Sequence, residues 1–109
     1  MSVFEGVIRE EIERVKSNIF SYKKMLEKLP KGSIFIQKKY HSYFVYRKHR
    51  ENDKIISDYI GPLESLNAQA EIDKSNEYRR IKKNIKIAEE ELNELEKAVK
   101  VYDRQRKAS

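Results

Sequence analysis

The sequence predicts an α+β fold in which two long amphipathic helices flank a three-stranded antiparallel β-meander. Apolar residues recur at heptad spacing near both ends of the chain, and between these segments their spacing changes to every second residue. The predicted helices pair as an antiparallel coiled coil. With 109 residues, the chain is expected to form a single domain, residues 1–109.

The first helix is predicted over residues 2–28. Pro30 cannot continue it, and Gly32 is typical of a residue just beyond a helix end. Seven seam residues alternate in steps of four and three, namely Ile8, Ile12, Val15, Ile19, Tyr22, Leu26 and Leu29.

The meander is predicted over residues 33–60, where β-branched and aromatic residues dominate. Turns are expected near residues 39–41 and near residues 51–53, where Asn52 and Asp53 tolerate left-handed backbone angles. Alternation then places Phe44 and Tyr46 on one side of the sheet, and Tyr43, Val45 and Arg47 on the other.

The second helix is predicted over residues 63–106, with Gly61 at the cap and Pro62 at the first helical position. The pattern loses phase around residues 73–77, which makes a break there plausible. The seam comprises Tyr78, Ile81, Ile85, Ala88, Leu92, Leu95, Val99 and Tyr102.

The positive charge is concentrated in the predicted sheet. The chain has a net charge of +6, and residues 31–62 contain seven basic and three acidic groups. The second helix has a basic block followed by an acidic block, which would match in an antiparallel homodimer formed through helix 63–106. The basic block is Arg79, Arg80, Lys82, Lys83 and Lys86, and the acidic block is Glu89, Glu90, Glu91, Glu94 and Glu96.

The usual sets of catalytic residues are missing. His41 and His49 have no partner at a metal-ligand spacing, and the three glycines form no phosphate-binding loop. The run of glutamates 89–91 is typical of a solvated helix face. We therefore expect a protein that is not an enzyme, with no cofactor and no metal.

The chain has no cysteine, which favours a reducing compartment such as the cytoplasm. No apolar run approaches the length of about 18 residues that a membrane-spanning helix needs. The sequence thus predicts no membrane partner.

Aromatic and basic residues are interleaved in the meander. Sheets that bind nucleic acid combine cations for phosphates with rings for stacking. An alternative stays open, in which the rings are only good strand formers and the cations protect the sheet edges. The candidate nucleic-acid-binding residues are Lys38, Lys39, Tyr43, Tyr46, Arg47, Lys48 and Arg50.

The meander resembles a known type of sheet. The segments that show this are residues 31–34, 43–47, 54 and 57–61, with a lysine turn after the first. They resemble the arm-binding N-terminal sheet of phage-type tyrosine recombinases, and also short uncharacterised bacterial and phage proteins with such a sheet between helices. The chain lacks the usual Asn-Gly turn and a catalytic recombinase domain. The resemblance implies DNA or RNA contact by Lys38, Lys39, Arg47, Lys48 and Arg50.

The leading hypothesis is a non-enzymatic nucleic-acid-binding accessory protein of phage or mobile-element type. The alternative is a phage-encoded protein-binding inhibitor, such as an anti-CRISPR protein acting on a nuclease–guide RNA complex. A third hypothesis is a structural coiled-coil adaptor. The partner is accordingly DNA, RNA or a protein complex that contains nucleic acid.

Overall fold

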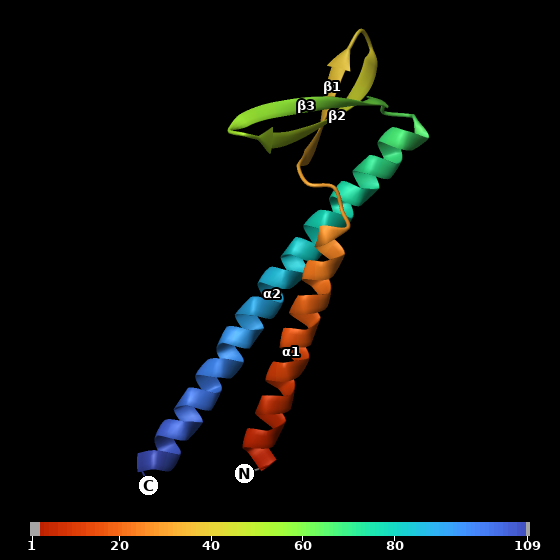
Figure 1. The fold of residues 1–109 in the computed structure, drawn as a ribbon. Coiled ribbons are helices and arrows are strands. Elements are labelled where there is room, and N and C mark those ends of the chain that lie inside the picture. Colours follow the sequence, from red (N-terminus) through yellow and green to blue (C-terminus); the bar gives the residue numbers. More distant parts are fainter. Residues whose placement is uncertain (1–2, 109) are drawn as a thin grey trace. The chain divides into compact units, whose positions relative to one another are not determined.

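The fold is α+β, as the sequence predicts (Figure 1). A computed structural model describes residues 3–108, with the backbone alone for residues 106–108; residues 1, 2 and 109 lie outside the description. Contacts divide the chain into two compact units. The helical unit contains Met1–Leu26 and Ile81–Ser109, and the sheet unit contains Glu27–Arg80. The elements are α1 (Val3–Glu27), β1 (Ser33–Lys39), β2 (Ser42–Glu51), β3 (Lys54–Pro62) and α2 (Leu66–Ala108).

The helical unit is held together by a short apolar seam. Val15 and Ile19 of α1 and Ala88 of α2 are buried, and Leu92 and Leu95 pack against them. All five residues belong to the predicted heptad positions. Heptad spacing therefore identified the side chains that the two helices bury against each other.

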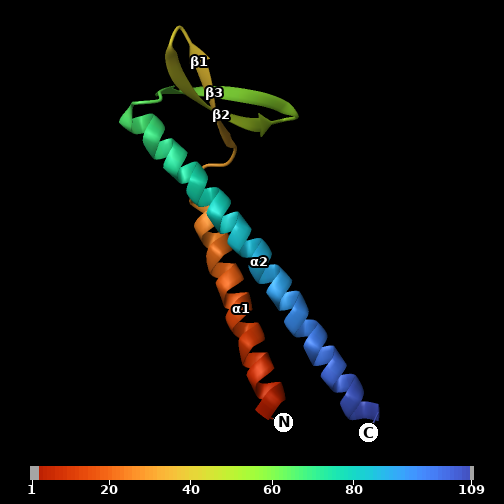
Figure 2. The same cartoon turned by 180° about the vertical axis from the view of Figure 1, so that it is seen from behind.

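The two helices of this unit run antiparallel. The rings of Phe4 and Tyr102 lie 5.2 Å apart between centroids, and Lys23 Nζ lies 3.9 Å from a carboxylate oxygen of Glu89. The helices lie side by side in both views (Figures 1 and 2). These contacts are consistent with the predicted antiparallel coiled coil. Neither helix has, within residues 3–108, the combination of length and apolarity needed to cross a membrane.

The three strands form one antiparallel sheet in the order β1-β2-β3, as the sequence predicts. Both connections are two-residue turns at the predicted places. Tyr40 and His41 in the first turn have φ angles of 50° and 69°, and Asn52 and Asp53 in the second have 48° and 66°. Positive φ at both central residues defines the hairpin turn whose twist matches that of the strands.

The helix α2 begins three residues later than predicted, because the sheet continues through Pro62. The Leu63 amide donates to the Tyr43 carbonyl at 3.0 Å, which extends the sheet contact beyond β3. Ser65 is the cap, since its Oγ accepts a hydrogen bond from the Ala68 amide at 3.1 Å. The predicted cap at Gly61 was therefore wrong.

The helix α2 is continuous through residues 73–77, where a break was plausible from the sequence. Ala68 and Ser75 are buried, and Ile72 is half-buried between them. Ile72 and Ser75 line a groove in the sheet unit together with residues 34–36 of β1. The buried stripe of Ala68, Ile72 and Ser75 keeps the spacing of four and three residues. Two of its members have small side chains, which do not stand out in a hydrophobic pattern.

Candidate nucleic-acid interface

The strand register divides the side chains of the sheet between two faces. Phe35 of β1 is opposite Tyr46 of β2, and Tyr46 is opposite Tyr59 of β3, so these three rings share one face. Val45 and Arg47, one position before and after Tyr46, lie on the other face. The first side is called the aromatic face below; it comprises Phe35, Lys39, Phe44, Tyr46, Lys48, Arg50 and Tyr59. The second is called the helix face, since it packs against α2 within the sheet unit.

Four rings form a continuous row across the three strands. Phe35 and Tyr46 are stacked, with centroids 5.0 Å apart and planes inclined by 15°. Tyr59 contacts both Tyr46 and Phe44, at centroid distances of 5.4 and 6.2 Å. Tyr59 is 56% exposed, whereas the other three are half-buried. Phe44, Tyr46, Tyr59 and Lys39 line a shallow hollow on this face.

The cations of the aromatic face lie beside these rings. Lys48 Nζ is 4.5 Å from the centroid of Phe35, which is cation–π distance. Lys48 and Arg50 are exposed, and Lys39 borders the hollow. Within residues 3–108 none of these three cations forms an ion pair. No strand position on the aromatic face holds an acidic residue.

The helix face has a different charge arrangement, because two of its basic side chains, Arg47 and His49, lie beside carboxylates. Arg47 Nη2 donates to Glu71 Oε2 of α2 at 2.6 Å, and His49 Nδ1 lies 3.4 Å from Asp58 Oδ2. The side chain of Arg47 is only 12% exposed and that of Glu71 is 20% exposed. Arg47 is thus engaged in holding α2 against the sheet.

The electrostatics of Glu71 agree with this role. Burial raises the pKa of its carboxyl, but hydrogen bonds from Arg47 and from Lys74, at 2.6 and 3.3 Å, hold that pKa below its ordinary value of 4.5. Glu71 is therefore ionised at neutral pH. The Arg47 guanidinium also donates weakly to the Lys31 carbonyl at 3.4 Å.

The structure divides the seven candidate residues between the two faces. Lys39, Tyr46, Lys48 and Arg50 come together on the aromatic face. Lys38, Tyr43 and Arg47 lie on the helix face, where Lys38 Nζ is 5.7 Å from the ring centroid of Tyr43.

Sequence reasoning missed three of the four rings of the aromatic face, namely Phe35, Phe44 and Tyr59. Phe35 and Tyr59 lie outside the segment in which aromatic and basic residues alternate most densely, and only the cross-strand register brings them beside Tyr46. The signal that could have found Phe35 and Tyr59 was the turn geometry. A two-residue turn at Tyr40-His41 sets the pairing of β1 with β2, and one at Asn52-Asp53 sets the pairing of β2 with β3.

Comparison of the chain with protein-family models, curated proteins and solved structures found no match. The resemblance to recombinase arm-binding sheets therefore stays a prediction. Residues 3–108 contain no cluster of three or more His, Asp or Glu side chains suited to a metal ion.

Proposed function

We propose that this protein is a non-enzymatic nucleic-acid-binding accessory protein, and that it binds a single strand on the aromatic face of its sheet. The supporting observation is the segregation of charge. Exposed cations lie beside a row of rings on one face, whereas the acidic side chains of the strands lie on the other. The phage or mobile-element setting rests on the resemblance of the meander alone.

Each part of the face has a chemical task in this proposal. Bases stack on Tyr59 and on the neighbouring rings, since every base has a π-face and stacking tolerates any sequence. Lys39, Lys48 and Arg50 neutralise phosphates. A duplex keeps its bases stacked inside, so it would use the cations but not the rings. We therefore expect tighter binding of single strands than of duplexes.

Salt dependence tests the charge component. Three cations that each neutralise one phosphate predict a slope of log K against log[salt] of about −2 for a single strand. Lys48→Ala should make this slope less steep by about 0.7. Lys100→Ala removes the same charge from the exposed surface of the helical unit and is the matched control, for which the slope should not change.

Fluorescence anisotropy with a labelled single strand and a labelled duplex, from about 50 to 200 mM salt, provides these slopes. Equal slopes for Lys48→Ala and Lys100→Ala would show that binding depends on net charge rather than on this face. Failure to bind nucleic acid at low salt would contradict the proposal and favour the protein-binding inhibitor, whose partner would be an acidic protein surface.

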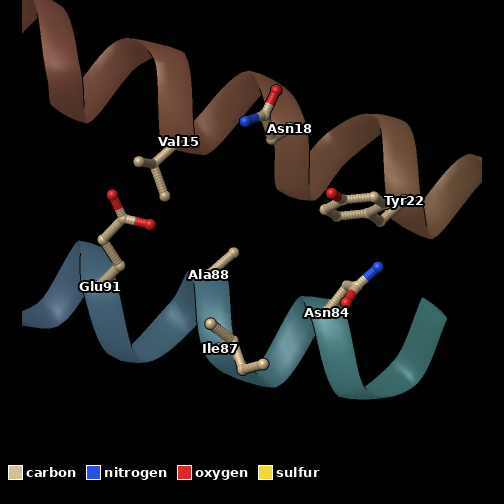
Figure 3. A pocket seen from close by; sticks show the side chains of 7 residues that line it. All are labelled: Val15, Asn18, Tyr22, Asn84, Ile87, Ala88 and Glu91. Atoms are coloured by element: carbon tan, nitrogen blue, oxygen red, sulfur yellow. The ribbon is translucent and has the colours of Figure 1, made fainter. Parts of the chain in front are cut away.

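The proposal includes a homodimer formed through the helical unit. Leu95 and Tyr102, which could have driven self-association, are instead engaged with α1. Ile87 and Val101 of α2 are exposed and lie fourteen residues apart, which places them on one stripe of the helix. Ile87 borders a groove in which Val15 and Ala88 point toward the opposite helix (Figure 3).

Charge complementarity supports a second copy of the chain as the occupant of this stripe. In an antiparallel pair of α2 helices centred on Ile87, Lys83 of one copy is opposite Glu91 of the other, because each lies four residues from Ile87. Glu91 also lies 3.5 Å from Arg14 Nη2 of its own α1, so its carboxylate would be shared between Arg14 and Lys83. The two-fold axis creates the Lys83–Glu91 pair twice. The two Ile87 side chains contact each other at the centre of this proposed interface.

A further inference from the structure

The two hairpin turns of the sheet have the same backbone geometry but very different residues. All four central residues adopt left-handed angles, with φ between 48° and 69°. Asn52 and Asp53 are among the few residue types that tolerate this region. Histidine is also enriched in this region, whereas Tyr40 is not typical of such a turn and is strained there.

Nothing within the described part of the chain compensates for this strain. Tyr40 is 95% exposed, so its ring buries almost no surface on folding. Among residues 3–108, the side chains of Tyr40 and His41 form no hydrogen bond, ion pair or ring contact. A residue that is unfavourable for the turn and makes no contact in the fold is a candidate for contact with a ligand.

Cations lie on both sides of this tip. Lys39 directly precedes Tyr40 and belongs to the aromatic face, whereas Lys38 belongs to the helix face. The Lys38 ammonium lies near the Tyr43 ring on one face, and Lys39 borders the hollow on the other, so the strand that leads to Tyr40 carries one cation on each face. This arrangement suits one nucleotide of a single strand, in which a base is flanked by a phosphate at either end. A base in an intact duplex offers no free π-face to the Tyr40 ring.

We propose that the tip formed by Tyr40 and His41 is a second contact point for nucleic acid, where the Tyr40 ring stacks on an unpaired base and Lys38 and Lys39 bind its two phosphates. This inference rests on the proposed function. It extends the site from the aromatic face to the end of the β1–β2 hairpin.

The test replaces Tyr40 and His41 by Asn-Gly, the pair that such turns favour. The double variant Tyr40→Asn, His41→Gly should raise the midpoint of thermal unfolding, because Asn-Gly suits this turn. It should bind a labelled single strand about tenfold more weakly, as the loss of one stacking contact predicts. Asp53→Gly creates the same Asn-Gly pair in the other turn, and its affinity for the strand should equal that of the unmodified protein.

Two single variants separate the ring from the turn. Tyr40→Phe keeps the ring and should retain the affinity, whereas Tyr40→Leu should lose about tenfold. Unchanged affinity in Tyr40→Leu and in the double variant would overturn the inference, as would a lower unfolding midpoint in the double variant. If the tip variants bind normally but Tyr59→Leu weakens binding, the inference about the tip is wrong and the proposed function stands. If the unmodified protein binds no single strand, both the inference and the proposed function are wrong.

Discussion

Arg47 and Lys48 are adjacent cations of β2 for which the structure predicts opposite outcomes. Arg47→Ala removes the hydrogen bond to Glu71 and leaves a half-buried carboxylate with Lys74 as its remaining partner, 3.3 Å away. A hydrogen bond between charged groups contributes about 1.5–3 kcal/mol, and breaking a fully buried ion pair costs about 3–5 kcal/mol. Because these side chains are 12% and 20% exposed, we expect a loss of about 2 kcal/mol in the free energy of unfolding.

Lys48→Ala should change this free energy by less than about 0.5 kcal/mol, since Lys48 is exposed on the aromatic face. The assay is urea denaturation, followed by circular dichroism. The slope of the free energy of unfolding against urea concentration is compared between variants, because an unchanged slope shows that only stability has changed. The binding experiment should show the reverse order, because Lys48→Ala weakens the salt dependence and Arg47→Ala does not. A loss under about 0.5 kcal/mol for Arg47→Ala, or a change in its salt slope equal to that of Lys48→Ala, would refute the assignment of Arg47 to the fold.

Three further predictions concern stability and association. Ile81→Ala should cost about 2–5 kcal/mol in urea denaturation, because Ile81 is only 1% exposed, whereas Leu66→Ala at an exposed position should cost little. The contribution of the Arg47–Glu71 pair should be complete above about pH 4.5 and should disappear as the pH falls through the lowered pKa of Glu71, so the urea midpoint of the unmodified protein should fall more steeply in acid than that of Arg47→Ala. Ile87→Glu should convert a dimer to a monomer in sedimentation equilibrium at tens of micromolar, whereas Phe20→Glu, at another exposed apolar position, should not; a monomeric unmodified protein would contradict the dimer.

Local patterns in the sequence were sufficient for most of the fold. Heptad spacing identified the seam residues Val15, Ile19 and Ala88, and the two-residue period identified the strands. Asn52 and Asp53 marked their turn by residue type. These features depend on neighbours along the chain, which the sequence shows directly.

The remaining features depend on partners that are distant in sequence. The packing of α2 on the sheet uses Ala68 and Ser75, whose small size, rather than hydrophobicity, suits the contact. Arg47 belongs to the fold because of Glu71, which lies 24 residues later. Arg47 and Lys48 belong to one basic stretch of the sequence. Only the position of α2 distinguishes the helix face, which holds Arg47, from the aromatic face, which holds Lys48.

Two exposed tyrosines of the same sheet provide the sharpest comparison of its faces. Tyr59 is 56% exposed on the aromatic face, and Tyr43 is 44% exposed on the helix face. Anisotropy with a labelled single strand at one salt concentration should show that Tyr59→Leu weakens binding by about 1–3 kcal/mol while Tyr43→Leu leaves it unchanged. Equal affinities for the two variants, or a larger loss for Tyr43→Leu, would contradict the assignment of nucleic-acid binding to the aromatic face.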